Sequence, residues 1–227
     1  MTTLNIPMPR EHLERIVRQA VRERLSRGVP TAPAAAYTPN PVVNVSARHM
    51  HISHADLKTL FGPQAELTVY RWLYQPGEFA AEQTVTIFGP RRRMIERVRI
   101  LGPARKYTQI ELALTDAIAL GIDAPVRRSG DHSGTPGCVV VGPGGVLEMT
   151  QGVIRAARHA HMSGADAEHY GFADGQYIRL RVDSSCATTF GQVLCRVDPR
   201  FLLEVHLDTD EGNACDLPNA TAVELLA

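Results

Sequence analysis

Two histidine pairs of the form His-x-His are the residues of this 227-residue chain whose type and spacing most directly suggest chemistry. They are His49 with His51, and His159 with His161. In a β-strand, residues i and i+2 project from the same face, so each pair would present two imidazoles side by side. Imidazole binds zinc, copper, iron or nickel. Two such strands brought together would place four ring nitrogens in one cavity, and the spacing therefore predicts a metal site.

The two pairs lie inside an internal repeat. Ala47–Ser53 recurs as Ala157–Ser163 after a shift of 110 residues, with five of the seven positions identical. A single His-x-His is most simply explained by two solvent-exposed histidines on a strand, but a pair duplicated within a repeated frame favours a metal site. Each copy is followed by a short helical pattern and a glycine. The simplest architecture is two copies of one small β unit related by a pseudo-twofold.

The far ends of the two repeats correspond more loosely and offer further ligands. Ile110–Asp116 resembles Val205–Asp210, which puts Glu111 and His206 at related strand positions. Carboxylate oxygens and imidazole nitrogens are both common zinc ligands. We therefore expect Glu111 and His206 to join the two histidine pairs, with the Glu111 carboxylate placed to bridge two metals.

The remaining histidines and the cysteines are expected to do no chemistry. We interpret four histidines as solvated surface residues: His12, His54, His132 and His169. The four cysteines, Cys138, Cys186, Cys195 and Cys215, form no Cys-x-x-Cys pair and are too sparse for a secreted disulfide scaffold. The sequence predicts that they are packing residues in a reducing compartment and that catalysis is not covalent.

Composition excludes several classes of protein. Hydrophobic residues at 44% and charged residues at 21% are close to the averages of globular proteins, which excludes an intrinsically disordered chain for most of the length. Equal numbers of basic and acidic residues, 24 of each, remove the overall attraction to nucleic acid or to an anionic membrane. We find neither an export signal nor about 18 consecutive apolar residues, and so expect neither secretion nor a membrane span.

From Pro41 onward the sequence pattern predicts a mainly β fold. Short alternating or β-branched runs, separated by Gly, Pro and Asn/Asp clusters, are typical of a sandwich or barrel. The runs are Val42–Val45, Leu67–Tyr70, Thr84–Ile87 and Arg97–Leu101. Short helices are predicted at His54–Phe61, Asp116–Gly121 and Gly164–Tyr170, each too short to form a layer alone, so we expect them to cap barrel ends.

The first forty residues read differently. Residues 10–27 predict an amphipathic helix, because apolar residues recur at three- and four-residue spacing from Leu13 to Leu25. The Pro/Ala stretch Thr31–Pro41 then favours an extended linker. A tethered appendage and an ordinary helix packed on the body fit this pattern equally well.

One basic segment has a candidate function. Arg91 to Lys106 contains seven basic residues and a single acidic one, and most of them are interpreted as a solvated hairpin face. Arg105 differs, because Gly102-Pro103 predicts a turn just before it and Glu111 follows six residues later. Its guanidinium could bind phosphate in bidentate fashion beside the metal. The glycine-rich Gly142–Gly145 lacks the spacing of a phosphate-binding loop and predicts a hairpin turn.

With these residues in view, the chain resembles the PduL-type phosphate propanoyltransferases, the phosphotransacylases of bacterial microcompartments. The resemblance runs from about Pro41 to Ala214 through motifs in the same order: Val45–His51, Gln75–Ala80, Val98–Arg105, Thr108–Glu111, Pro125–Gly130, Arg158–Met162 and His206–Glu211. Two departures are Glu78, where the family usually has Gln, and Gly212, where Ala is usual. Neither coincides with a proposed metal ligand.

The resemblance implies a reaction and a set of site residues. The reaction interconverts acyl-CoA plus phosphate with acyl phosphate plus free CoA, usually with propanoyl groups. Two zinc ions per chain are implied, held by His49, His51, Glu111, His159, His161 and His206, with Glu111 bridging. Arg105 would hold phosphate, which makes Arg105 and Glu111 the expected catalytic residues. Ser46 and Ser129 are candidates for substrate contacts.

The resemblance also implies fold, partners and location. It implies two closed β-barrels, one formed by residues 41–47 with 156–227 and the other by residues 48–155. Residues 1–40 resemble an encapsulation peptide that would bind microcompartment shell proteins and place the enzyme in the microcompartment lumen. A homo-oligomer is expected, with no nucleic acid or membrane partner.

Two other classes fit the same ligands. A dinuclear zinc hydrolase of esters or phosphoesters would use the same metal pair. A non-catalytic protein tied together by structural zinc is a third possibility, but structural sites are usually closed and four-coordinate, whereas six ligands for two metals leave open positions. Strict dependence of acyl phosphate formation on added phosphate would favour transfer over hydrolysis.

Overall fold

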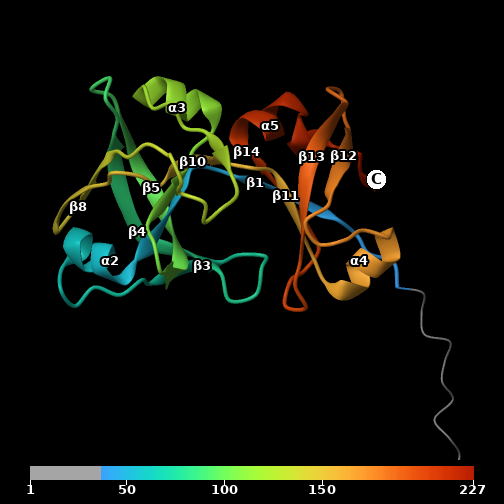
Figure 1. Ribbon diagram of the computed structural model, residues 1–227, viewed down its shortest axis with the longest axis horizontal. Helices are drawn as coiled ribbons and strands as arrows, with labels where there is room; N and C mark the ends of the chain where they lie inside the picture. The colour runs from blue at the N-terminus through green and yellow to red at the C-terminus, as the bar shows by residue number, and fades with distance from the viewer. Residues whose placement is uncertain (1–36) are drawn as a thin grey trace, which may run out of the picture. The chain divides into compact units, whose positions relative to one another are not determined.

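Two curled β-sheets make up most of the computed structural model, which describes residues 37–227 (Figure 1). The first, here the N-terminal sheet, has the order β7 (Val126–Arg127), β10 (Val153–Ala156), β6 (Gln109–Glu111), β2 (His49–Ser53), β5 (Met94–Arg105), β4 (Phe79–Phe88), β8 (Val139–Gly142) and β9 (Gly145–Glu148), with β3 (Val69–Trp72) also paired to β4. The second, the C-terminal sheet, has the order β1 (Val42–Ser46), β14 (Glu204–Asp208), β11 (His159–Met162), β13 (Thr188–Val197), β12 (Tyr177–Asp183) and β15 (Ala222–Leu226). The fold is mainly β, as predicted.

The two sheets share one topology over five strands. In the N-terminal sheet β10, β6, β2, β5 and β4 are neighbours, with β10·β6 and β2·β5 parallel and β2·β6 and β4·β5 antiparallel. In the C-terminal sheet β1, β14, β11, β13 and β12 repeat the same order and the same directions. This is the repetition that the duplicated sequence frame predicts. The strand β1 therefore crosses from the start of the described chain into the C-terminal sheet.

The predicted closure of the barrels is not observed. Within residues 37–227, each hydrogen-bonded ladder ends in two edge strands, β7 and β9 in one sheet and β1 and β15 in the other. Closing a sheet requires tilted strands long enough to pair along both edges. The edge strand β7 has two residues, which is too little backbone for a second ladder. The sheets are curled half-barrels.

Each sheet covers its own hydrophobic core. Met50 and Ile52 of β2 are fully buried in one cluster, and Ala160 and Met162 of β11 in another. Complete burial of each large aliphatic side chain contributes about 1.5–3 kcal/mol relative to its exposure. Because side chains alternate along a strand, filling the cores with these residues directs the intervening histidines to the opposite face.

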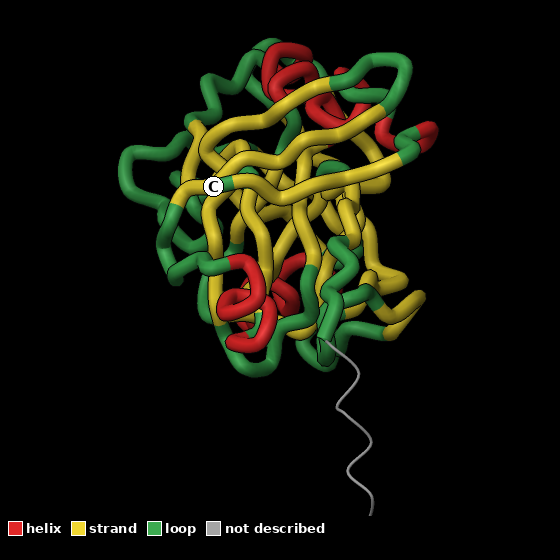
Figure 2. The backbone as a smooth tube through the Cα atoms, turned by 90° about the vertical axis from the view of Figure 1, so that its right-hand side faces the viewer, coloured by secondary structure: helices red, strands yellow, loops and turns green. Residues whose placement is uncertain are grey.

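Within residues 37–227, four short helices lie at the ends of the strands rather than across the sheets (Figures 1 and 2). They are α2 (His54–Phe61), α3 (Leu114–Leu120), α4 (Gly164–Tyr170) and α5 (Thr209–Ala214), and a 3₁₀ turn, η1 (Leu217–Asn219), follows α5. The side chains of Ser53 and Ser163 cap α2 and α4 by accepting hydrogen bonds from Asp56 N and Asp166 N. The bounds predicted for α2 and α4 are confirmed, and α3 begins two residues earlier than predicted.

The two expected turns have different outcomes. Gly142 pairs with Gly145 at the tip of the β8–β9 hairpin, so the hairpin prediction is confirmed. Gly102-Pro103 makes no turn; both residues lie inside β5, where the ladder with β2 shifts register between His51 and Ser53. The irregularity absorbs the proline, which has no N–H to donate to a regular ladder.

Several predictions concern residues outside 37–227 or the division into domains. The helix at residues 10–27, its linker and His12 lie outside residues 37–227. Residues Pro39–Ala227 form one compact unit, and the predicted boundaries of the two barrel domains stay a prediction. Within residues 37–227, no helix is long and apolar enough to cross a membrane.

Candidate metal centre

The first His-x-His pair forms a three-ligand cluster with Glu111. His49 Nε2 lies 3.2 Å from His51 Nε2. The Glu111 carboxylate faces both rings, with Oε2 at 3.5 Å from His49 Nε2 and Oε1 at 3.7 Å from His51 Nε2. All three side chains are buried. Three donor atoms thus converge on one point, as they do around a metal ion.

The second pair forms a matching cluster with His206. The ring centroid of His159 lies 4.9 Å from that of His161 and 4.8 Å from that of His206, and those of His161 and His206 are 5.0 Å apart. One nitrogen from each of these three rings lies within 4.8 Å of the others. The six residues predicted as ligands therefore form two groups of three.

Strand register explains why Glu111 and His206 complete the clusters. Across the antiparallel ladder β2·β6, His49 pairs with Glu111, and across β11·β14, His159 pairs with His206. Directly opposed residues on one face have close Cβ atoms. The two registers are equivalent positions of the repeat, so the structure brings together the residues that the sequence repeat matched.

Hydrogen bonds orient the rings. His49 Nδ1 donates to Ala47 O at 2.8 Å, and His159 Nδ1 donates to Ala157 O at 2.9 Å. A carbonyl oxygen can only accept, so the proton sits on Nδ1 and the Nε2 lone pair is free for a metal. His206 Nδ1 is hydrogen-bonded to Ser46 Oγ at 3.0 Å. The hydrogen bond from Nδ1 to a backbone carbonyl thus occurs at equivalent positions in both repeats, at His49 and at His159.

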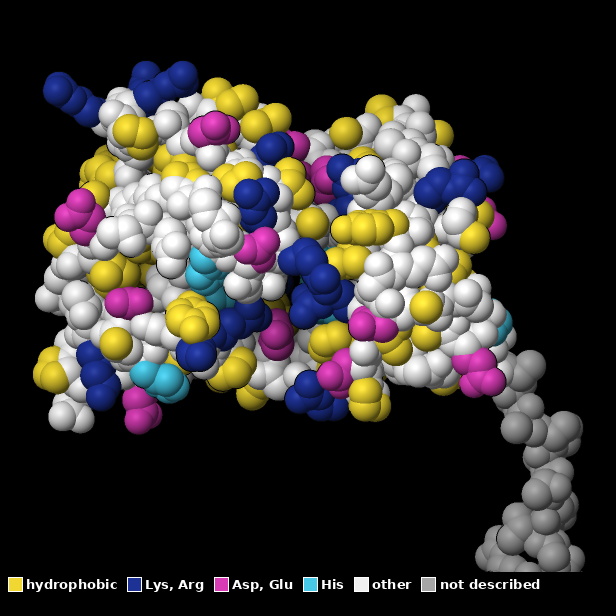
Figure 3. All heavy atoms as spheres, viewed as in Figure 1, with side chains coloured by type: hydrophobic (Ala, Val, Ile, Leu, Met, Phe, Trp, Pro, Cys, Tyr) yellow, Lys and Arg dark blue, Asp and Glu magenta, His cyan; other side chains and the backbone are white. Residues whose placement is uncertain are grey.

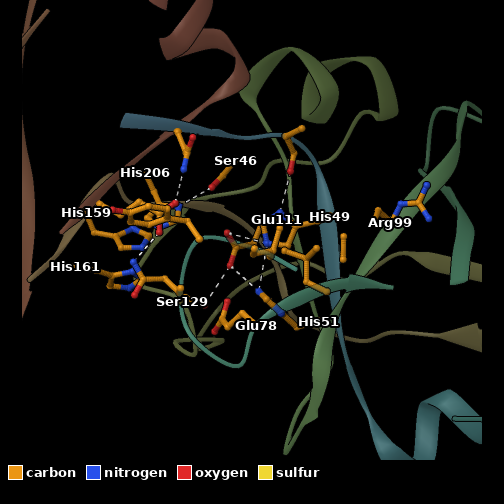
Figure 4. Close-up of a pocket in the computed structure, with 18 of the residues that line it drawn as sticks. Ser46, His49, His51, Glu78, Arg99, Glu111, Ser129, His159, His161 and His206 are labelled. Carbon is orange, nitrogen blue, oxygen red and sulfur yellow. Dashed lines mark hydrogen bonds and ion pairs between the residues drawn. The ribbon is translucent and has the colours of Figure 1, made fainter. Parts of the chain in front are cut away.

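Glu111 is held as a carboxylate. Gln109 Nε2 donates to Glu111 Oε1 at 2.6 Å, and Ser129 Oγ donates to the same oxygen at 3.1 Å. Burial alone would raise the pKa of the Glu111 carboxyl, but His49 and His51 outweigh burial and hold this pKa well below its usual range. Figure 4 shows Glu111 between the two histidine clusters. An ionised carboxylate in this place suits a shared metal ligand.

The buried nitrogens test whether these residues fit a metal. His51 Nδ1 and His161 Nδ1 are buried without a hydrogen-bond partner, and His206 Nε2 makes no hydrogen bond but lies 3.2 Å from Glu204 Oε2. Burial is the largest cause that lowers the pKa of His159 to about 4 and of His161 to about 2, which keeps both rings neutral. Neutral imidazoles with free lone pairs and an ionised carboxylate are the donor forms that zinc binds. The residues fit the metal that the sequence predicts.

The two clusters open into one cavity of about 990 Å³ lined by both sheets. Its walls include all six candidate ligands and also Ser46, Arg105 and Ser129. A cavity of this size is in the range that holds cofactor-sized ligands. The three residues predicted to contact substrate are therefore placed in the same cavity as the candidate ligands.

Comparison with known proteins decides the family. The family model for phosphate propanoyltransferase matches residues 42–218. A phosphate propanoyltransferase of Planctopirus limnophila is 53% identical over 96% of this chain and 91% of its own length; one of Thermotoga maritima is 50% identical over 83% and 90%; one of Rhodopseudomonas palustris is 40% identical over 96% and 98%. The chain belongs to the phosphate propanoyltransferase family. It is therefore an acyltransferase.

The two departures noted against phosphate propanoyltransferases have local structural roles. Glu78 lines the cavity, and its Oε1 lies 3.3 Å from Arg105 Nη2. Although Glu78 is not a predicted ligand, it contacts the residue predicted to hold phosphate. Gly212 leaves room for Val45, since a Cβ at this glycine would approach Val45 Cγ2 to 2.5 Å.

The sequence patterns did not point to two residues that support the candidate ligands. Gln109 and Glu204 precede Glu111 and His206 by two positions, and Glu204 Oε2 lies 3.2 Å from His206 Nε2. The i, i+2 rule applied at the ends of the repeats could have found both.

Two minor predictions need correction. His132 is not fully solvated: it is partly buried, and its Nε2 lies 2.9 Å from Gln109 Oε1. It sits in a loop, where no periodicity points to a neighbour. His54 and His169 are exposed, as predicted. The second correction concerns one cysteine. All four cysteines are free, and Cys138, Cys195 and Cys215 are buried packing residues as predicted, but Cys186 is exposed.

Proposed function

We propose that this protein interconverts acyl-CoA plus phosphate with acyl phosphate plus CoA, with propanoyl as the acyl group, at a dinuclear zinc site. The observation that carries the proposal is the pair of three-ligand clusters facing one cavity in a member of the phosphate propanoyltransferase family. Relatives named phosphate propanoyltransferase support the choice of substrates.

The six candidate ligands would hold two zinc ions per chain. His49, His51 and Glu111 would hold one, and His159, His161 and His206 the other, with Glu111 shared. Zinc ions there would orient phosphate, polarise the acyl carbonyl and stabilise the oxyanion that develops on it. Three protein ligands for each metal leave a position for substrate, which is typical of catalytic rather than structural sites.

Residues of the chain would position the reactants. Arg105 would hold phosphate oxygens through its planar guanidinium, and the hydroxyls of Ser46 and Ser129 would contact substrate from either side of Glu111. A phosphate oxygen then forms a bond to the thioester carbonyl carbon, the carbon–sulfur bond breaks and CoA leaves as a thiolate. Because a thiolate is a good leaving group, no strong general acid is needed.

Direct attack in a ternary complex is favoured over an acyl-enzyme. No cysteine is among the residues that line the cavity. Burial raises the pKa of the Cys138 thiol to about 12 and that of Cys195 to about 11, so neither supplies a thiolate nucleophile at neutral pH. Phosphate itself is then the nucleophile that meets the thioester.

Residues 1–40 would act outside the reaction. We propose that the amphipathic pattern of residues 10–27 binds microcompartment shell proteins, which would place the enzyme in the microcompartment lumen, and that the protein forms a homo-oligomer. Supporting this division of labour, the family match begins at residue 42.

The decisive experiment measures CoA release from propanoyl-CoA with and without phosphate. Transfer requires CoA release to depend on phosphate and to match acyl phosphate formation one for one. Equal CoA release without phosphate would identify a zinc hydrolase instead. Bound metal is measured on the same purified protein, where about two zinc ions per chain are expected and loss of zinc to a chelator should abolish both products.

A further inference from the structure

Arg196 is a cavity residue that the proposed reaction has not yet used. It lies on β13, in register with the candidate ligand His161 across the parallel ladder β11·β13. Paired residues of a parallel ladder project to the same face, and both side chains line the cavity. At the equivalent position of the N-terminal sheet, Leu101 pairs with His51. Of the two repeats, the C-terminal one therefore has an arginine at this position and the N-terminal one has a leucine.

The guanidinium of Arg196 has no anionic partner. Within residues 37–227 it makes no hydrogen bond or ion pair. Its close contact is with the ring of Phe201, whose centroid lies 5.9 Å from the guanidinium carbon. Phe201 also packs against His161, with ring centroids 4.3 Å apart. Phe201 thus links the arginine to the candidate ligand and leaves its five N–H donors unused.

Arginines from the other sheet make the surroundings of Arg196 basic. Partial burial, followed by the charges of Arg128 and Arg105, lowers the pKa of the Arg196 guanidinium. The two carboxylates that act on Arg196 are both engaged elsewhere: Glu78 is paired with Arg105, and Glu111 faces His49 and His51. Figure 3 shows Lys and Arg side chains on both sides of the hollow between the two sheets. Cations gathered in this way repel one another unless an anion lies among them.

We infer that Arg196 binds the phosphate substrate together with Arg105, so that the two sheets grip one phosphate between them. The inference rests on the proposed function. A guanidinium offers two parallel N–H groups that match two phosphate oxygens. The same contact holds the phosphoryl group of acyl phosphate in the reverse direction.

The position of Arg196 indicates that its ligand is inorganic phosphate and not a phosphate group of CoA. Arg196 pairs in register with a candidate metal ligand, so the anion it meets lies beside the reacting atoms. In CoA the diphosphate is separated from the reactive sulfur by the whole pantetheine arm. A CoA molecule with its thioester at the metal ligands therefore carries its diphosphate well away from this arginine.

The test measures phosphate binding without turnover. Thermal unfolding of the full-length, zinc-loaded protein is followed over a series of inorganic phosphate concentrations, because a ligand that binds the native state raises the unfolding temperature. Arg196→Gln should weaken the apparent phosphate affinity by about tenfold or more. Arg196→Lys keeps the charge but loses the fork and should fall between. Arg181→Gln, an exposed arginine paired with Asp183, is the matched control.

Two results would overturn the inference. One is a wild-type phosphate response in both Arg196 variants. The other is a normal phosphate response combined with a lost response to CoA, which would assign Arg196 to the CoA phosphates. Zinc content and unfolding without phosphate check that the variants fold, and Arg196→Lys serves if the Gln variant does not. Failure of the proposed function would be seen separately. If the unmodified protein released CoA equally fast without phosphate, phosphate transfer would be refuted, but phosphate binding by Arg196 could still be measured.

Discussion

Thr115 and Asp210 occupy equivalent positions in the two repeats and are hydrogen-bonded to each other. Thr115 N donates to Asp210 Oδ2 at 2.9 Å, and Thr115 Oγ1 donates to Asp210 Oδ1 at 2.6 Å. Each follows its cluster residue by four positions, Glu111 in one repeat and His206 in the other. Contact between equivalent residues is what a twofold relation produces near its axis.

The ion pairs beside this contact repeat as well. Arg48 Nη1 lies 2.6 Å from Asp116 Oδ1, and Arg158 Nε lies 2.7 Å from Glu211 Oε1. Each arginine directly precedes the first histidine of its pair, and each acid follows directly after Thr115 or Asp210. Both repeats thus join the start of the His-x-His strand to the helix that follows Glu111 or His206.

We predict that Asp210→Ala lowers the free energy of unfolding by about 1 kcal/mol, the usual effect of losing a helix cap. The N-cap residue of α3, Ala113, provides no side-chain cap, and Asp210 supplies the missing acceptor from α5. Urea unfolding measures the change, with exposed Asp123→Ala as the control. Equal stability of the two variants would mean that the contact contributes nothing.

Removing a candidate ligand should remove metal and activity together. His49→Ala, His159→Ala and Glu111→Ala are each expected to reduce turnover by at least about 100-fold, since losing only a residue that orients a ligand typically costs 10–100-fold. Metal analysis of each variant should show less than the wild-type zinc content. His54→Ala is the control, because His54 is exposed on α2. A zinc content unchanged in all three variants would contradict the ligand assignment.

Arg105→Lys should raise the KM for phosphate about tenfold, or lower kcat, with zinc content intact. The substitution keeps the positive charge but loses the planar fork that binds two oxygens. Initial rates at varied phosphate and fixed propanoyl-CoA measure the effect. Wild-type phosphate kinetics in this variant would remove Arg105 from the phosphate site.

Glu78→Gln should act in the opposite direction. The Glu78 carboxylate competes with phosphate for Arg105, and both side chains are about 38% exposed, so solvent screens their attraction. We expect the KM for phosphate to fall about two- to fivefold, the range that corresponds to a partly exposed ion pair. An increased KM would instead show that Glu78 positions Arg105 for binding. Glu82→Gln, an exposed acid on β4, is the control.

The sequence was sufficient to predict which residues form the two clusters, because two rules act locally. Strand alternation places His49 with His51 on one face, and the repeat matches Glu111 with His206. Both depend on backbone geometry and not on the rest of the fold. The mainly β class and the helices α2 and α4 followed from similar local patterns, including the Ser53 and Ser163 caps.

What the sequence could not predict depends on contacts between distant segments. Arg196 carries no motif, and only the β11·β13 register places it beside His161. His132 reaches Gln109 from a loop, where no period applies. Barrel closure depends on whether edge strands meet, and Gly102-Pro103 reads as a turn locally although neighbouring strands keep it within β5.

The last prediction concerns residues 1–36. Their pattern places Leu13, Ile16 and Val17 on one apolar stripe of a helix of about 18 residues, a length that is marginal alone in water. Such a stripe is stabilised by a partner, either a shell protein or another copy of itself. Removing residues 1–36 should therefore leave kcat and zinc content unchanged, consistent with a family match that begins at residue 42, and should reduce self-association measured by light scattering.

The same residues should target another protein to microcompartments when fused to it. Fused to a fluorescent protein and expressed in a host that makes microcompartments, residues 1–40 should direct fluorescence to them. The matched control replaces Leu13, Ile16 and Val17 with Ser in the fusion, which removes the apolar stripe and should leave fluorescence diffuse. Diffuse fluorescence from the unmodified fusion, or a truncated enzyme that fails to fold, would mean that the segment packs on the body of the protein, because its apolar side chains would then be needed there.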